Sequence, residues 1–138
     1  MELVLSDSSR VIAGVMLITI VTIEFGGSFV ARMAVNKVPA TEFQKTFARA
    51  GHGHAGMLVT LGLVGLLMAD AAGLTGIMGM MGRLGVPVAA ILIPAGFFFS
   101  SMGKGEITKP NGWFALTWLG AAILAIGVLT LGIGLLAG

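Results

Sequence analysis

The two histidines of the chain, His52 and His54, lie two residues apart in a glycine-rich run, RAGHGHAG, that leads directly into an apolar segment. An imidazole can ligate a metal ion or move a proton near neutral pH, and ionisable groups inside a membrane indicate a function by default. Gly51, Gly53 and Gly56 leave space beside the rings that packing alone would not require. We therefore interpret this run as a site for iron or another metal, with proton handling and plain packing as the alternatives.

The spacing of the histidines limits how they can bind a metal. Successive residues of a helix are turned by about 100°, so two rings two residues apart point in directions about 160° apart. We therefore expect one histidine to be an axial ligand and the other to lie beside the site or at an interface. The chain has no cysteine, which excludes disulfides, thiolate nucleophiles and iron–sulfur sites.

The composition defines the class of protein. Of the 138 residues, 57% are hydrophobic and only 10% are charged, which is typical of an integral membrane protein. The net charge of +2 comes from lysines and arginines spread over short connections, without a basic stripe, so we predict no nucleic-acid partner.

We predict an all-α fold, a membrane four-helix bundle that forms a single domain over residues 1–138. A span needs about 20 apolar residues, and the sequence offers four: 11–31, 50–69, 86–102 and 114–137. Ser8 and Ser9 are candidate N-caps of the first helix. The TEFQ run at 41–44 fits a capping box, which predicts that the second helix begins near Glu42 and carries both histidines into the membrane.

The third helix is expected to have Pro87 in its first turn and a kink at Pro94. Glycines recur at every third residue from Gly73 to Gly85, between the second and third spans. This run is too short and too poor in proline for a collagen-like helix, so we interpret it as a tight interfacial turn or a short helical hairpin.

The distribution of basic residues predicts the orientation. By the positive-inside rule the first and third loops are cytoplasmic and both termini lie outside, as expected for the cytoplasmic membrane of a bacterium. Six basic residues flank those two loops, and two lie on the other side: Arg32, Lys37, Lys45, Arg49, Lys104 and Lys109 against Arg10 and Arg83.

Polar residues within the spans fall at one depth. Glu24 lies about 12 Å along its helix from the predicted cytoplasmic end, and the histidines lie about 5 to 8 Å in. With Ser28, Ser100 and Ser101 they predict one polar or cofactor-bearing chamber in the cytoplasmic half, and a featureless apolar outer half. Glu24 is either a structural acid, protonated or paired, or a group that moves protons or assists a cofactor.

Small residues form a stripe along the second helix. Membrane helices associate closely through such residues, so we interpret the stripe as a packing seam and place it at a contact between subunits. Its members are Gly51, Ala55, Gly62, Gly65 and Ala69.

Several motifs resemble the styrene oxide isomerases. The segment 47–57, FARAGHGHAGM, is similar to the start of that family's second helix, where an Ala-Arg-Ala-His-Ser-Gly run carries a haem-ligating histidine. The segment 95–101, AGFFFSS, with the following GKG loop and the KPNGW run at 109–113, resembles the family's third helix and Pro-Asn loop. Ala13 and Gly14 in the first span are a further, weaker match.

The resemblance implies a membrane homotrimer that holds haem b near subunit contacts. Its ferric iron would act as a Lewis acid on an epoxide oxygen of a small hydrophobic substrate and promote rearrangement to an aldehyde without redox turnover. The cofactor-binding residues would be His52, His54, Arg49, Gly51, Ala55 and Ser101, and the catalytic candidates are Glu24 and Phe98.

The chain also departs from that family. It has no tyrosine, so Phe97 or Phe98 replaces the aromatic hydroxyl of the family's third helix. The family's asparagine downstream of the histidine is Met57 or Leu58 here, and Glu24 stands where the family is apolar. Adjacency to the Ala-Arg-Ala run favours His52 as the ligand, whereas the small-residue stripe lies closer in angle to His54. Two alternative functions remain open. The chain could be a proton or metal-ion carrier that uses Glu24 and the histidines, or an accessory subunit of a larger membrane complex.

Overall fold

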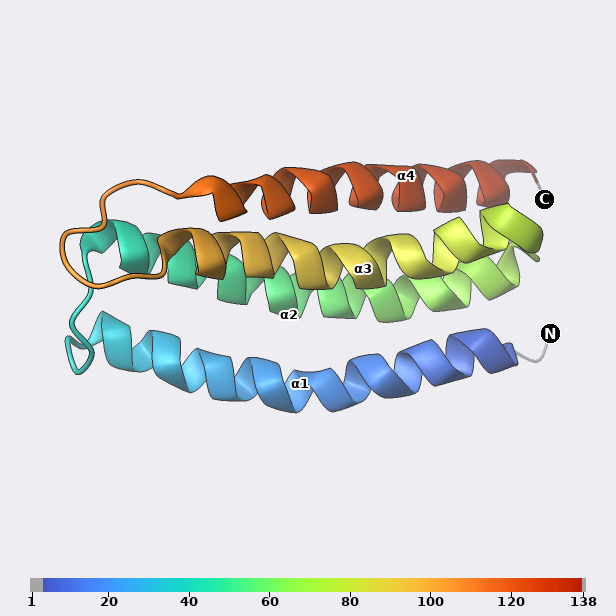
Figure 1. Cartoon of the computed structure of the whole chain (residues 1–138). Coiled ribbons are helices and arrows are strands. Elements are labelled where there is room, and N and C mark those ends of the chain that lie inside the picture. The colour runs from blue at the N-terminus through green and yellow to red at the C-terminus, as the bar shows by residue number, and fades with distance from the viewer. Residues whose placement is uncertain (1–3, 138) are drawn as a thin grey trace.

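The computed structural model describes residues 4–137, and in this range it is an antiparallel arrangement of four long helices (Figure 1). All four helices are long and apolar enough to cross a membrane, which confirms the predicted class of fold. Both ends of the chain lie at the same end of the bundle (Figure 1). The helices are α1 (Asp7–Ala34), α2 (Glu42–Ala71), α3 (Gly76–Ser101) and α4 (Ala115–Ala137), with a short 3-10 turn, η1 (Gly112–Phe114), before α4.

The start of α2 confirms the predicted capping box. The Gln44 amide N–H donates to Thr41 Oγ1 over 3.2 Å, and the Thr41 N–H donates to Gln44 Oε1 over 3.0 Å. The helix therefore begins at Glu42 and both histidines lie inside it. The N-cap of α1 is Ser6, whose hydroxyl oxygen accepts the Ser9 N–H. The prediction of Ser8 or Ser9 as the N-cap was therefore wrong by two or three residues.

The glycine run between the second and third spans is mostly helical, contrary to the prediction of a turn or a separate hairpin. α3 begins at Gly76, ten residues before the predicted start, so Pro87 lies well inside the helix and not in its first turn. Only Gly73 and Gly76, with φ near +60°, have the left-handed conformation of a true turn. In a membrane the backbone N–H and C=O groups have no water to bond with, so the hydrogen bonds of a helix are especially favourable there. Their contribution exceeds the conformational entropy that the glycines lose in the helix.

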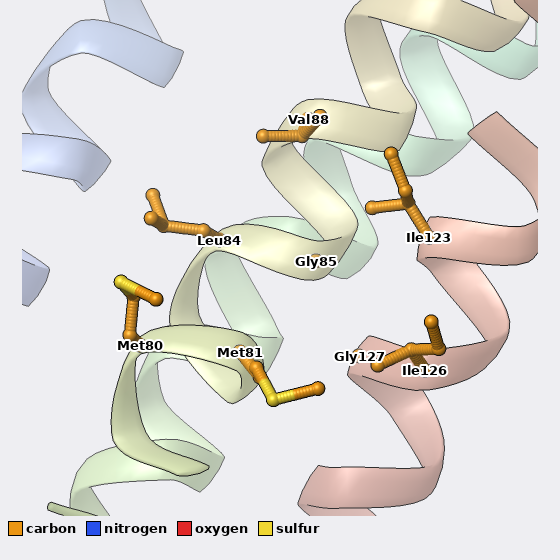
Figure 2. A pocket seen from close by; sticks show the side chains of 8 residues that line it. All are labelled: Met80, Met81, Leu84, Gly85, Val88, Ile123, Ile126 and Gly127. Atoms are coloured by element: carbon orange, nitrogen blue, oxygen red, sulfur yellow. The ribbon is translucent and has the colours of Figure 1, made fainter. Parts of the chain in front are cut away.

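Glycines in α3 allow close contacts with α4. A Cβ added to Gly85 would lie 2.5 Å from the Cα of Gly127 in α4, so neither position has room for a side chain. Figure 2 shows the two glycines facing each other, with Ile123 and Ile126 of α4 beside them. They border an apolar cavity of about 270 Å³ between α3 and α4.

The predicted small-residue seam of α2 is confirmed as a packing surface, since all five members are buried. Its partners lie within the same chain. A Cβ on Gly62 would collide with Met16 of α1, and one on Gly65 would contact Leu131 of α4. The structure therefore uses the seam to hold the four-helix bundle together, and does not leave it free for a contact between subunits.

α1 is the least buried helix. It packs mainly along α2, whereas α2, α3 and α4 pack together (Figure 1). Of its 28 residues only Ser9, Met16 and Met33 are buried. Met16 joins Val59 and Leu66 of α2 in one apolar cluster, and partly buried side chains of α1 also pack against it: Ile12, Ala13, Ile20 and Ile23.

A buried ion pair joins three helices at the end of the bundle where the termini lie. Arg83 of α3 donates from Nη2 to Asp70 Oδ1 of α2 over 2.6 Å, and both side chains are less than 15% exposed. Asp70 also accepts the Ser6 N–H over 2.9 Å, and Arg83 Nε donates to Ser9 Oγ over 3.1 Å. We call these four residues the clasp. It corrects two expectations: Arg83 is a helical residue, not a loop residue, and this half of the bundle is not featureless.

Candidate functional site

The two histidines lie on different sides of α2, as their spacing predicts. The His52 ring lies against α1, where a Cβ added to Gly27 would be 2.8 Å from its Cε1 and 3.0 Å from its Nε2. The His54 ring stacks on Phe97 of α3, with 5.2 Å between centroids and 28° between planes. No group of three or more His, Asp or Glu side chains within residues 4–137 is placed to hold a metal ion. A bound metal would therefore need its other ligands from elsewhere.

His54 is oriented by its own helix. Its Nδ1 lies 2.7 Å from the carbonyl oxygen of Ala50, one turn earlier. A carbonyl can only accept a hydrogen bond, so Nδ1 carries a proton, and in the neutral ring the lone pair is then on Nε2. The ring therefore has the tautomer and the fixed orientation that an axial imidazole ligand requires.

Phe97, which stacks on His54, belongs to a cluster of aromatic side chains. The ring of Phe97 meets Phe47 of α2 edge-on, with 5.3 Å between centroids, and Phe114 of η1 in the same way at 5.7 Å. Phe114 in turn meets Trp118, which is 70% exposed on the outside of α4. His54 thus lies at the border between an aromatic cluster and the membrane-facing surface.

The glycines near the histidines have two different roles. Gly51 is buried, and a Cβ there would be 3.0 Å from the ring of Phe98, so this glycine serves the contact of α2 with α3 and does not leave open space. Gly53 and Gly56 have nothing within 4 Å of an added Cβ. A helical glycine costs up to about 1 kcal/mol relative to alanine, and within the chain these two gain no packing in return.

Glu24 lies on the same side of the bundle as His52. It is exposed on α1 and makes no hydrogen bond or ion pair with any other residue in the range 4–137. It precedes Gly27, which His52 contacts, by three residues or about 4.5 Å of helix. Glu24 is therefore on the helix that His52 contacts, whereas His54 contacts α3.

The other predicted site residues do not line a common chamber. Ser101 is buried and donates to the Phe97 carbonyl over 3.0 Å, while the exposed Ser28 donates to the Phe25 carbonyl over 2.7 Å. Short hydroxyl side chains bond to their own helix in this way when nothing else competes. Ala55 is buried in the seam, and Arg49 is exposed.

The clasp was not predicted from the sequence. In the sequence, Arg83 contributes only to the predicted orientation, and no role is assigned to Asp70. The available signal was two opposite charges, thirteen residues apart, on either side of a short turn at 72–75. Arg83 lies about two turns into α3, and its side chain reaches back to the turn, where Nη1 donates to the Leu74 carbonyl and Nη2 to Asp70.

Comparison with protein-family models, with curated proteins and with solved structures finds no match to this chain.

Proposed function

We propose that this chain is a haem b-binding integral membrane protein in which His54 is the axial ligand. The observation that carries the proposal is the bond from His54 Nδ1 to the Ala50 carbonyl, which leaves Nε2 free to bind iron. A porphyrin supplies four ligands of its own, so one protein nitrogen is enough and a cluster of side chains is not needed. His52 is less suited, because its Nε2 lies against the backbone of α1.

The surroundings of His54 fit a flat apolar cofactor. Phe97 covers one side of the ring, and the open Gly53 adjoins it in sequence. Arg49 is exposed on the same helix, but five residues before His54 it is turned about 140° from it, so its charge lies on the side of His52. When bound, a ferric haem supplies an electrophilic iron with an open position, which in the styrene oxide isomerases serves epoxide rearrangement to an aldehyde. In this chain His54 would hold the cofactor, and the aromatic cluster with Phe98 behind it would exclude water.

The test is an absorption spectrum of the protein purified with haem available. We expect a Soret band and about one haem per chain. If the wild-type protein takes up no haem, the proposal fails, and a proton or metal-ion carrier using His52 and Glu24 becomes the better explanation of the intramembrane polar residues.

We further propose that the chain forms a homotrimer. The support is Glu24, an exposed carboxyl group on a helix that spans the membrane, since contact with hydrocarbon is costly for such a group and a neighbouring copy would cover it. The small-residue seam of α2 is not the contact, because it is buried within the chain. Mass measurement in mild detergent is expected to give three chains per particle, and a monomer alone would contradict this.

We also propose that the loops at 35–41 and 102–111 face the cytoplasm. These two loops meet, since Thr41 Oγ1 donates to the Ile107 carbonyl, and Gln44 Nε2 in the first turn of α2 donates to the Gly103 carbonyl over 3.3 Å. Six of the eight basic residues thus gather at one end of the bundle, and only Arg10 and Arg83 lie at the other. Two reporters fused after residue 138 test this. We expect activity from a reporter that works only outside the cytoplasm, and no activity from one that works only inside it.

A further inference from the structure

An apolar groove of about 430 Å³ separates α1 from α3. Its walls run from Val11 to Ile23 on α1 and from Leu84 to Ile91 on α3, and Ala55 of α2 is part of its floor. The groove is present because α1 packs along α2 and scarcely meets α3. Figure 2 shows Leu84 pointing from α3 towards α1, away from α4.

The groove offers no unsatisfied polar group along its length. Its two hydroxyl side chains are bonded to their own helix: Thr19 donates to the Met16 carbonyl over 2.7 Å and Thr22 to the Thr19 carbonyl over 2.6 Å. The part of the ligand that lies here must therefore be hydrocarbon.

One end of the groove opens into a polar mouth. A second cavity, of about 270 Å³, shares Ile12 and Leu84 with the groove and is also lined by Ser8 and Arg83. Three nitrogens of Arg83 each donate one hydrogen within the protein. Nε donates to Ser9, Nη2 donates to Asp70, and Nη1 donates to the Leu74 carbonyl. Each Nη carries a second hydrogen, so two donors remain for a ligand. The mouth thus combines hydrogen-bond donors with a direct opening onto hydrocarbon.

The length of the groove matches one leaflet of a bilayer. Val11 to Ile23 covers about 18 Å of helix, and half of the hydrocarbon core is about 15 Å. A helix of a second copy does not fit, because a cylinder 10 Å wide and 18 Å long occupies about 1400 Å³. The whole empty space of the groove, its open side included, is about 1010 Å³, which is still less than that volume.

From these observations we propose that the groove and its mouth bind one membrane phospholipid. One acyl chain lies between α1 and α3, and the headgroup lies at the mouth, where Ser8 and Arg83 donate to it. The bound chain fills the space that the weakly packed α1 leaves, so the lipid is a structural part of the bundle. The site faces α1 and not the Phe97 side of α2, so it is independent of the proposed haem site.

Intact-protein mass spectrometry in mild detergent tests this proposal. After reconstitution with phosphatidylcholine and re-extraction, the wild-type protein is expected to keep one lipid per chain. Val15→Trp fills the groove and should lose the lipid. Ile18→Trp is the matched control, because Ile18 lies on the same helix, is 73% exposed against 58% for Val15, and does not line the groove.

A second variant tests the mouth. Ser8 is exposed, so Ser8→Trp leaves the core intact while it obstructs the opening, and we expect several-fold less retained lipid. The proposal is overturned if the wild type retains no phospholipid, if Val15→Trp retains as much as Ile18→Trp, or if a non-lipid apolar molecule occupies the protein instead. Haem content is measured on the same samples and is expected to be equal in all of them.

Discussion

Replacement of His54 by alanine is expected to abolish the Soret band of the haem-loaded protein. The variant removes the nitrogen that the Ala50 carbonyl orients towards iron, and residues 4–137 offer only His52 as another imidazole. His52 cannot substitute without rearrangement, because it lies on another side of α2 with its ring against Gly27. Absorption spectra and haem content per chain measure the effect.

Addition of imidazole distinguishes loss of the ligand from loss of the fold. His54→Ala leaves a cavity beside Phe97 that free imidazole can occupy, so the Soret band is expected to return at high imidazole concentration. A variant that has lost its fold would not recover, and its circular dichroism would also change.

His52→Ala and Glu24→Gln are the matched controls. Both side chains lie on the α1 side of the bundle, so both variants are expected to keep haem content within the range of the wild type. If His52→Ala abolishes the Soret band and His54→Ala does not, the assignment of the ligand is reversed. If neither variant changes it, the histidines do not hold the haem.

The local features of the fold could be predicted because they depend on neighbouring residues. The capping box at Thr41 and Gln44 is a short-range hydrogen-bond exchange, so its pattern identifies the first residue of α2. The different directions of the two histidines follow in the same way from the fixed rotation per residue of a helix.

The extent of α3 and the clasp could not be predicted, because both depend on distant partners. Gly85 is tolerated in a helix because Gly127 of α4 packs directly on it, and nothing near Gly85 in the sequence indicates this. Once α3 begins at Gly76, Arg83 is carried into the helix and towards Asp70. One wrong helix boundary therefore concealed the ion pair.

The same limit applies to the candidate site. The sequence places Gly51 beside the histidines, but only the packed structure shows that its space is occupied by Phe98. It likewise places Ser101 at the depth of the histidines, whereas the structure shows its hydroxyl bonded to the Phe97 carbonyl.

Replacement of Asp70 by alanine is expected to destabilise the bundle by about 3–5 kcal/mol, the usual cost of leaving one partner of a buried ion pair without the other. The Arg83 side chain is 14% exposed, so its charge would have little access to water. The same change removes the acceptor of the Ser6 N–H and hydroxyl, which help to hold the start of α1. Denaturation in mild detergent, followed by circular dichroism, measures the free energy of unfolding.

The chain contains a matched control for the clasp. Asp7 pairs with Arg10 over 2.9 Å, but these side chains are 89% and 71% exposed, so Asp7→Ala should change the stability little. The double variant Asp70→Leu with Arg83→Met removes both charges, and is expected to regain much of the stability that Asp70→Ala loses, because an apolar pair leaves no buried charge unpaired. If the double variant is as unstable as Asp70→Ala, the hydrogen bonds to Ser6 and Ser9, and not the ion pair, hold α1 to the bundle. If Asp70→Ala is as stable as Asp7→Ala, the clasp does not stabilise the fold, and α1 is held by the cluster around Met16 alone.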